Sequence, residues 1–229
     1  SGGADAGNYT ANTTASTTAD ISAAPLVIGI TADNKIYDGN SNAATQASIT
    51  SGLVSGDAVT VTSTNGLFNN KNVGTAKPVT SDVAVSGGAD AGNYTANTTA
   101  STTADIITKA ISGNFTVDAS KVYDGNTLAH VTNSTLVGTI AGDNVNLSGV
   151  ANYNNKNIGI GKTVTLNGAN LTGSDAGNYH LTSVSTTTAD ITVRTLHLSS
   201  FGADSKVYDG NTVATGIGFV DDRVTGDVL

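Results

Sequence analysis

The sequence has no cysteine, no methionine and no tryptophan among its 229 residues, and it has only two prolines. Without cysteine, the chain can form neither disulfides nor thiolate metal sites. This composition suits a protein exported through an oxidising periplasm, where stray thiols cross-link. No apolar run approaches the length of a membrane span, so membrane insertion is not expected.

Glutamate is also absent, because all 18 acidic residues are aspartate, a poorer helix former than glutamate. The formal net charge of −8 and the isoelectric point near 4.5 argue against nucleic acid and anionic membranes as partners. Aromatic residues make up only 5%, while threonine, valine, glycine and asparagine are abundant. These residues favour strands and turns, so we expect an all-β fold with at most one short helical turn per unit.

Repetition dominates what is present. The motif Lys-(Val/Ile)-Tyr-Asp-Gly-Asn-(Thr/Ser) places Tyr37, Tyr123 and Tyr208 at intervals of about 85 residues. Asp-Ala-Gly-Asn-Tyr, Thr-Ala-Asp-Ile and Asn-Asn-Lys-Asn-(Val/Ile)-Gly keep the same interval. Residues 1–21 repeat residues 86–106 letter for letter. The sequence therefore predicts an array of similar units.

We divide the chain into four parts on this basis. Residues 1–21 are the C-terminal end of a preceding repeat, residues 22–106 and 107–191 are complete repeats, and residues 192–229 are the N-terminal part of a following repeat. Units of this size bury only a small core, so neighbours are expected to support one another. We expect the incomplete parts to be completed by their missing halves or by neighbouring chains in a head-to-tail polymer.

Several local patterns predict individual elements. The apolar run at residues 26–30 predicts a first strand, and the alternation at residues 59–62 predicts a half-buried strand. Residues 9–21 are expected to form an extended strand that follows an Asp-Ala-Gly-Asn turn. Pro78 indicates an edge strand or a strand start. Residues 41–48 are the one place where a helical turn is expected.

We interpret the recurring Tyr-Asp-Gly as a folding signature. The tyrosine is expected to bury its ring and keep its hydroxyl on a backbone acceptor. Asp-Gly supplies a tight turn with a positive φ at glycine, and the lysine two residues before the tyrosine is expected to cover the ring. The residues assigned to this structural signature are Tyr37, Asp38, Gly39, Tyr123, Asp124, Gly125, Tyr208, Asp209, Gly210, Tyr94 and Tyr179.

The four motifs, in this order and over essentially the whole chain, resemble the YDG repeat. That family is close to the MBG (mostly β-grasp) repeats of giant bacterial surface proteins. The resemblance implies tandem β-grasp-like modules arranged as an elongated rod in secreted adhesins, many of which resemble filamentous haemagglutinin. The family brings no catalytic residues, so we do not expect an enzyme.

The expected function is that of a passive spacer, a stalk or fibre segment of a repetitive bacterial adhesin at the cell surface or in a biofilm matrix. Expected partners are neighbouring repeats, like chains in a fibre, and a host or matrix polysaccharide bound through a distal tip. A carbohydrate- or surface-binding module stays open as the alternative. Thr60, Thr62 and Thr64 fall on one strand face, which is compatible with an ordered surface such as ice or polysaccharide.

No cofactor is expected, with calcium as a minor alternative. Asp118 and Asp124 are the candidate calcium ligands, because Ca²⁺ takes several converging oxygen atoms, but turn chemistry already accounts for both. His130, His180 and His197 do not recur at the repeat interval. No serine, histidine and aspartate keep a repeated arrangement, so the sequence gives little support for a hydrolase.

Overall fold

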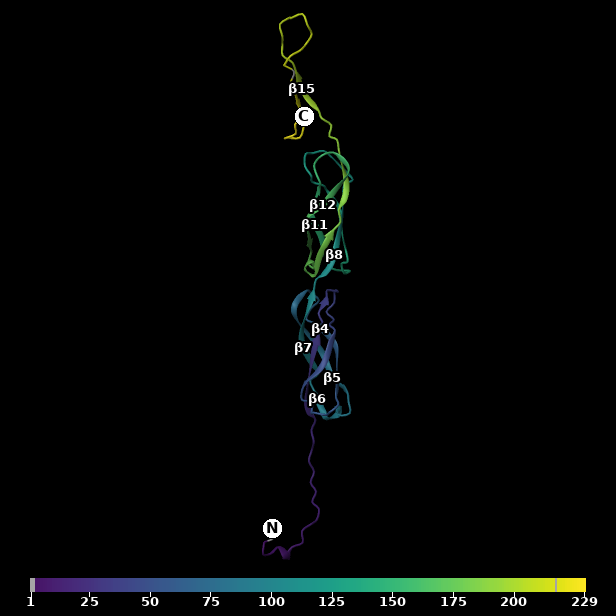
Figure 1. Cartoon of the computed structure of the whole chain (residues 1–229), viewed down its shortest axis with the longest axis vertical. Coiled ribbons are helices and arrows are strands. Elements are labelled where there is room, and N and C mark those ends of the chain that lie inside the picture. The colour runs from purple at the N-terminus through teal and green to yellow at the C-terminus, as the bar shows by residue number, and fades with distance from the viewer. Residues whose placement is uncertain (1–2, 217) are drawn as a thin grey trace. The chain divides into compact units, whose positions relative to one another are not determined.

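The computed structural model describes residues 3–216 and 218–229, and it confirms an all-β fold (Figure 1). The chain forms two compact units. Unit 1 contains the residues up to Asp33 together with 42–69 and 78–104. Unit 2 contains 34–41, 70–77 and the chain from Asp105 onward. The tyrosine of the first Tyr-Asp-Gly motif therefore belongs to unit 2.

Between residues 24 and 107 the chain forms one three-stranded and one four-stranded sheet. The strand order in the first is β3-β1-β6, in which β1 is antiparallel to β3 and parallel to β6. The order in the second is β2-β7-β5-β4. The strands are β1 (Ala24–Ala32), β2 (Lys35–Ile36), β3 (Thr45–Ser51), β4 (Thr60–Phe68), β5 (Gly74–Gly87), β6 (Tyr94–Ala96) and β7 (Thr99–Ile107).

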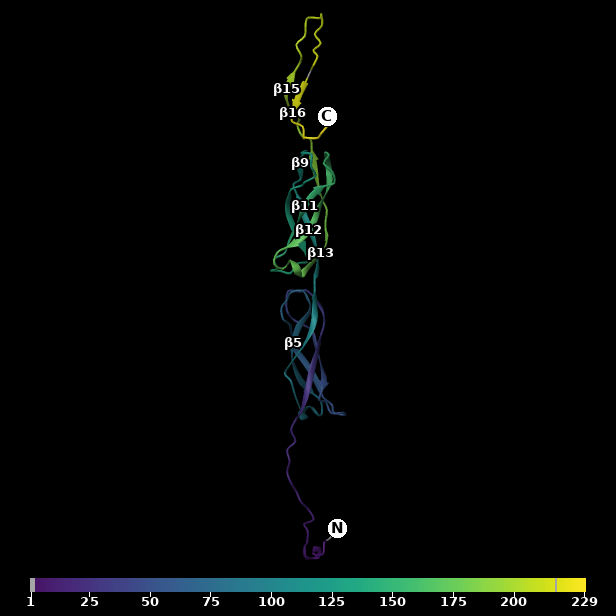
Figure 2. The same cartoon turned by 90° about the vertical axis from the view of Figure 1, so that its left-hand side faces the viewer.

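The same two sheets form again between residues 109 and 192, with orders β10-β8-β13 and β11-β12-β14-β9 (Figures 1 and 2). The strands are β8 (Lys109–Val117), β9 (Ser120–Val122), β10 (Val131–Val137), β11 (Asn146–Tyr153), β12 (Gly159–Thr172), β13 (Tyr179–Val184) and β14 (Thr187–Thr192). A further antiparallel pair, β15 (Leu198–Gly202) and β16 (Gly218–Asp221), follows. The two similar repeat sequences therefore form sheets with the same strand order.

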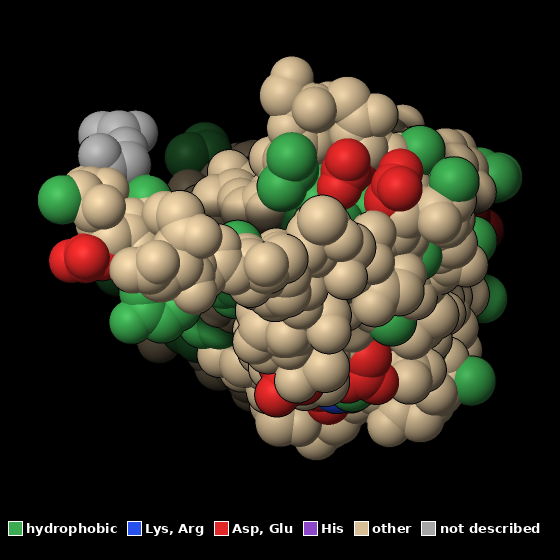
Figure 3. Space-filling model, turned by 90° about the horizontal axis from the view of Figure 1, so that it is seen from below, with side chains coloured by type: hydrophobic (Ala, Val, Ile, Leu, Met, Phe, Trp, Pro, Cys, Tyr) green, Lys and Arg blue, Asp and Glu red, His purple; other side chains and the backbone are tan. Residues whose placement is uncertain are grey.

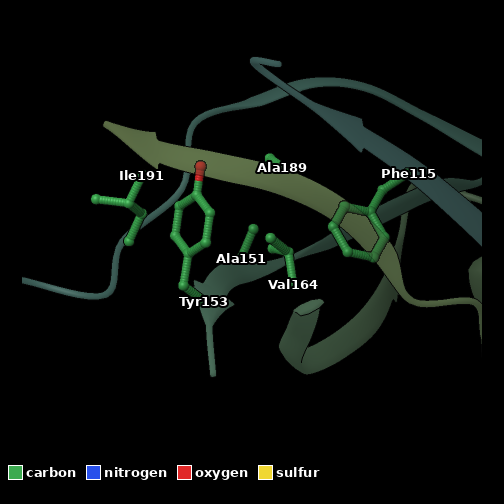
Figure 4. Packing of buried hydrophobic residues seen from close by; sticks show 6 residues of the cluster. All are labelled: Phe115, Ala151, Tyr153, Val164, Ala189 and Ile191. Carbon is green, nitrogen blue, oxygen red and sulfur yellow. The ribbon is translucent and has the colours of Figure 1, made fainter. Parts of the chain in front are cut away.

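Small clusters of alternating side chains form the cores. In β1 the side chains of Leu26, Ile28 and Ile30 are buried and those between them are more exposed, as the apolar run predicted. In unit 2 another core cluster gathers side chains from β8, β11, β12 and β14 (Figure 4). Its buried members are Phe115, Ala151, Tyr153, Val164, Ala189 and Ile191. Alanine fills two of these six positions, which fits the low aromatic content.

The helical turn expected at residues 41–48 is wrong. The second half of that segment lies in β3, where Ala47 pairs with Ile30 and Thr45 with Ala32. Ladder hydrogen bonds to β1 override the helix propensity of its alanines. The short helical turns occur at the Asp-Ala-Gly-Asn motif instead. They are the 3₁₀ turns η1 (Ala6–Asn8), η2 (Ala91–Asn93) and η3 (Ala176–Asn178).

Two further expectations need correction. Residues 9–21 form no strand, although their copy at residues 94–106 contributes to β6 and β7. Figure 1 shows this purple segment without a strand arrow. Pro78 lies on neither an edge strand nor at a strand start, because β5 is an inner strand of its sheet. Ala76, two residues before the proline, has a positive φ of 47°, which marks a local irregularity in β5.

The face in Figure 3 consists mainly of uncharged polar side chains and backbone, with acidic groups and single hydrophobic side chains between them. This matches a composition rich in threonine, serine, asparagine and glycine. No helix within the described residues is long and apolar enough to span a membrane.

Candidate functional site

The candidate site is built around a Gly-Asp turn that occurs three times in the chain. Side chains from the repeated motifs contact the aspartate of this turn. In all three copies, the aspartate N–H donates to the carbonyl oxygen three residues earlier, at 3.1 to 3.2 Å. The preceding glycine has a φ of 90° to 99°, a conformation that favours glycine. The aspartates are Asp57 in unit 1, and Asp143 and Asp227 in unit 2.

The complete arrangement is the Asp143 cluster, which we define as Tyr37, Lys71, Asp143 and Tyr179, all within unit 2. The Tyr37 and Tyr179 hydroxyls donate to Asp143 Oδ2 at 2.8 and 2.5 Å. The Lys71 ammonium donates to Asp143 Oδ1 at 2.9 Å. The Asp143 side chain is only 4% exposed, so its charge is both buried and fully compensated.

Aromatic contacts fix the geometry of this cluster. The rings of Tyr37 and Tyr179 meet edge to face, with centroids 5.4 Å apart and an interplanar angle of 76°. Lys71 Nζ lies 5.7 Å from the centroid of the Tyr37 ring. The Ile140 N–H donates to the Tyr179 hydroxyl oxygen at 2.9 Å, which orients that hydroxyl's own proton toward Asp143. Each polar group in the cluster therefore has a defined partner.

These contacts shift the ionisation of the cluster. Burial alone would raise the pKa of Asp143, but hydrogen bonds from Tyr179, Lys71 and Tyr37 lower it below its ordinary value. Burial, together with the hydrogen bond to Asp143, raises the pKa of Tyr179 to about 12. The hydrogen bond to Asp143 also raises the pKa of Lys71. At neutral pH the cluster therefore holds one carboxylate, one ammonium and two neutral phenols.

Backbone geometry completes the fit around the cluster. Gly39, of the first Tyr-Asp-Gly, has a φ of 82°, and a Cβ placed on it would lie 2.9 Å from Ile140 Cγ2. The Val73 N–H donates to Asn178 Oδ1 at 2.9 Å, and Asn178 Nδ2 donates to Asn72 Oδ1 at 3.3 Å. Glycine is thus required both by the turn and by the close approach of Ile140.

A second arrangement, the Asp227 cluster, consists of Tyr123, Lys156 and Asp227. The Tyr123 hydroxyl lies 2.9 and 2.8 Å from Asp227 Oδ1 and Oδ2, and Lys156 Nζ donates to Oδ1 at 2.9 Å. Lys156 Nζ is 5.8 Å from the Tyr123 ring centroid. A Cβ on Gly125 would lie 2.5 Å from Val224 Cγ1, the counterpart of the Gly39 contact. The same motif letters thus build the same contacts twice.

Unit 1 contains part of the arrangement. The Tyr94 hydroxyl donates to Asp57 Oδ2 at 2.6 Å and accepts from the Val54 N–H at 3.0 Å, as Tyr179 does with Asp143 and Ile140. Within the described residues, Asp57 accepts no hydrogen bond from a lysine or from a second tyrosine. We call this the Asp57 pair.

The predicted signature residues fall into two sets. Tyr37, Tyr123, Tyr94 and Tyr179 contact the Gly-Asp turns, whereas Tyr208 is 92% exposed. The aspartates and glycines of the signature make contacts and turns within their own motif. Asp38, Asp124 and Asp209 form ion pairs with Lys35, Lys121 and Lys206 at 2.7 to 2.8 Å, and Gly39, Gly125 and Gly210 have φ of 80° to 82°.

One detail of the sequence interpretation is wrong. The tyrosine hydroxyl donates to a carboxylate and not to a backbone acceptor. The lysine of the Lys-(Val/Ile)-Tyr motif places its ammonium on the aspartate that follows the tyrosine, and in the second repeat 5.5 Å from the centroid of the Tyr153 ring. That its stem covers the tyrosine ring stays a prediction. The ammonium that approaches the Tyr37 and Tyr123 rings belongs to the lysine of Asn-Asn-Lys-Asn, at Lys71 and Lys156.

The calcium candidates line one open hollow of about 360 Å³, together with Lys121, Tyr153 and His130. Asp124 is occupied by the Lys121 ammonium at 2.7 Å, and Asp118 Oδ2 lies 3.1 Å from His130 Nδ1. In the part of the chain that the structure describes, no three histidine, cysteine, aspartate or glutamate side chains gather as a metal site. Calcium therefore stays a prediction without a ligand set.

Sequence reasoning did not assign the Gly-Asp aspartates and the Asn-Asn-Lys-Asn lysines to a site. Both recur at the repeat interval, since Asp143 follows Asp57 and Lys156 follows Lys71 at about 85 residues. A charged residue that recurs in every copy of a weakly charged sequence is the signal that would have identified them.

A family model for the YDG domain matches the chain twice, over residues 22–104 and 107–189. No curated protein and no solved structure matches it. The YDG domain is not a known family of enzymes. The two matches cover most of the 229 residues and include both tyrosines that donate to Asp143, so the chain belongs to the YDG domain family.

Proposed function

We propose that the chain is a structural segment of a repetitive bacterial adhesin, in which YDG repeats act as a passive spacer at the cell surface or in the extracellular matrix. The observation that carries this proposal is the Asp143 cluster. In this cluster, residues of the recurring motifs connect the two family matches. Tyr37 and Lys71 come from the first match, and Asp143 and Tyr179 come from the second. A chain whose recurring side chains hold repeats together serves mechanics better than chemistry.

The remaining properties support the same proposal. A cysteine-free, acidic chain rich in small polar residues suits export and solubility in long arrays. The partners proposed are neighbouring repeats of the same chain or like chains in a fibre, and a polysaccharide bound by a distal tip. In this proposal, each repeat folds mainly through its own sequence, and the aspartate clusters connect each repeat to the next.

Stretching single molecules of the whole chain between its ends tests the spacer. We expect two main unfolding steps, each releasing at most about 28–31 nm, the fully extended length of an 85-residue repeat. Asp143→Ala should lower the force of the step that separates Tyr37 and Lys71 from Asp143, since it removes all three hydrogen bonds. Asp82→Ala is the matched control, because Asp82 is exposed and outside the cluster. Extension without resolved steps would contradict a mechanical role.

A second candidate is binding to an ordered surface. The side chains of Thr60, Thr62 and Thr64 are all exposed on one face of β4, which is an edge strand. A row of exposed threonines of this kind is compatible with binding to a regular surface such as ice or crystalline polysaccharide. Thermal hysteresis and pull-down with insoluble polysaccharide test it, and Thr62→Lys should abolish either signal. Absence of both signals in the unchanged chain would remove this candidate.

A further inference from the structure

The first two and the last two strands of each repeat run side by side in the same direction. In the first repeat, residues 24–26 of β1 pair in parallel with residues 94–96 of β6. Residues 35–36 of β2 then pair in parallel with residues 106–107 of β7. We call these the end-strand pairs of the first repeat. They join the beginning of the repeat to its end through backbone hydrogen bonds.

Side chains continue this connection between the two end-strand pairs. Asn97 Oδ1 accepts from the Ile28 N–H at 2.8 Å, and Asn97 Nδ2 donates to the Ile28 carbonyl at 2.9 Å. The Asp105 N–H donates to Asn34 Oδ1 at 2.6 Å. These bonds join residues 69 and 71 positions apart, close to the separation within the end-strand pairs. The two end segments are therefore connected at successive points along their length.

The second repeat has the same arrangement with longer pairs. Its end-strand pairs are β8 with β13 and β9 with β14, both parallel. The first contains five residue pairs against three in β1 and β6, and the second contains three against two in β2 and β7. At Gly113, the copy of Ile28, a backbone pair with Val184 replaces the two bonds from Asn97. The second repeat thus uses backbone pairing where the first uses an asparagine side chain.

Tension along the chain acts on these pairs in a particular direction. It pulls the beginning of a repeat backward and its end forward, so the two parallel strands are driven to slide past each other. The hydrogen bonds across a sliding pair share the load and must break together. In an antiparallel pair that is pulled apart at one end, the bonds break one after another. Thr108 alone lies between β7 and β8, so tension that leaves the first repeat passes directly into the second.

We infer that the end-strand pairs are the load-bearing elements of each repeat, so the repeats resist tension in addition to setting distance. This inference rests on the proposed function, which supplies the direction of the load. Because its pairs are longer, the second repeat should unfold at the higher force. The contacts that carry the load then lie within each repeat, whereas the Asp143 cluster connects one repeat to the next.

Changing the direction of pulling tests the inference on an unchanged fold. The chain has no cysteine, so two introduced cysteines give unique attachment points. Ser22→Cys with Thr108→Cys loads the end-strand pairs by sliding. Ser22→Cys with Ser55→Cys pulls β1 and β3 apart from one end, since they are antiparallel and Val27 lies opposite Ser51. All three positions are exposed.

We expect the first unfolding force to be lower in the second geometry by a factor of about two or more at the same loading rate, because its hydrogen bonds break singly. Equal forces in the two geometries would overturn the inference. Unfolding steps that do not depend on direction would remove only the load-bearing role of the end-strand pairs. Extension without resolved steps would contradict the proposed function as well.

A substitution tests the contribution of the first repeat's side-chain connection. In the chain stretched between its ends, Asn97→Ala should lower the force of the weaker unfolding step and leave the stronger step unchanged. Asn12→Ala is the matched control, because Asn12 lies in an identical local sequence and donates to the Thr14 carbonyl as Asn97 does to that of Thr99. The inference is wrong if Asn97→Ala lowers the urea midpoint of unfolding but neither unfolding force, or if both variants lower the force equally.

Discussion

Residues 1–21 and 86–106 have identical sequences, but residues 3–21 and their copies at 88–106 have different structures. Both contain a 3₁₀ turn at Ala-Gly-Asn, at Ala6–Asn8 and Ala91–Asn93. Only the second copy continues into strands, where Tyr94 pairs with Ala24 and Ile106 with Lys35. The turn is therefore encoded by the local letters, whereas the strands require partners elsewhere in the chain.

One asparagine shows the same division at the level of single hydrogen bonds. Asn12 Nδ2 donates to the Thr14 carbonyl at 2.7 Å, and its copy Asn97 donates to the Thr99 carbonyl at 2.8 Å. Asn97 additionally bonds both the N–H and the carbonyl oxygen of Ile28. The local bond is present in both copies, and the long-range bonds are present only where β1 is available.

The largest difference between the copies is expected at their last isoleucine. Ile106 is 1% exposed, whereas Ile21 is fully exposed. Ile106→Ala should lower the free energy of unfolding by about 2–5 kcal/mol, because it leaves a cavity in a packed core. Ile21→Ala should change it by less than about 0.5 kcal/mol. Urea denaturation followed by circular dichroism measures both, and equal effects would contradict the structural difference between the copies.

The next effect concerns the tyrosine hydroxyls. Tyr94→Phe removes the hydroxyl partner of Asp57 and of the Val54 N–H, so it should cost about 1–3 kcal/mol. Tyr179→Phe removes one of the three donors to Asp143 and the partner of the Ile140 N–H, and it should also cost about 1–3 kcal/mol. Tyr9→Phe, the same change in the unpaired copy, should cost less than about 0.5 kcal/mol. The same denaturation curves provide the measurement. A loss at Tyr9 as large as that at Tyr94 would show that residues 3–21 have a partner in solution.

A smaller difference is expected at the aspartate of Thr-Ala-Asp-Ile. Asp105 Oδ1 accepts from the Ala76 N–H at 2.7 Å, whereas its copy Asp20 is exposed. Asp105→Ala should cost about 1 kcal/mol through the loss of this hydrogen bond. Asp20→Ala removes the same charge and serves as the control. If both changes cost the same, the effect of Asp105 comes from its charge and not from its contact with Ala76.

The last prediction concerns alkaline pH, and it has no effect at neutrality. The pKa of Tyr179 is raised from 10.0 to about 12, so the folded chain keeps this proton longer than the unfolded chain does. The contribution of Tyr179 to the free energy of unfolding should be constant below about pH 10, and it should fall as the pH rises from about 10 to 12. Tyr179→Phe should reduce this fall, as measured by urea midpoints at each pH. An unchanged slope in the variant would assign the alkaline loss to other groups.

Much of the fold was predictable from the sequence because it depends on short-range patterns. The strand at residues 26–30 follows from its apolar run, and the positive φ of Gly39 follows from Asp-Gly in a tight turn. The failure at residues 41–48 arose because pairing with β1 outweighs alanine propensity. Residues 9–21 failed because strand formation depends on a partner that no local pattern reveals.

The candidate site was less predictable. Tyr37 was recognised as a signature residue, but its acceptor Asp143 lies 106 positions later and the spacing carries no geometric information. A backbone carbonyl was the ordinary expectation for a buried tyrosine hydroxyl. Lys71, whose ammonium lies over the Tyr37 ring, belongs to a different motif. Several lysines and aspartates recur in the sequence, and only the folded structure shows which of them are in contact.

The tyrosines of the first two Tyr-Asp-Gly motifs and the aspartates that receive them belong to different copies of the repeat, as Tyr37 and Asp143 do. Because every copy carries both halves of the contact, any copy can follow any other without new complementary surfaces. Genetic duplication or loss of a whole copy would then leave each of these contacts chemically unchanged.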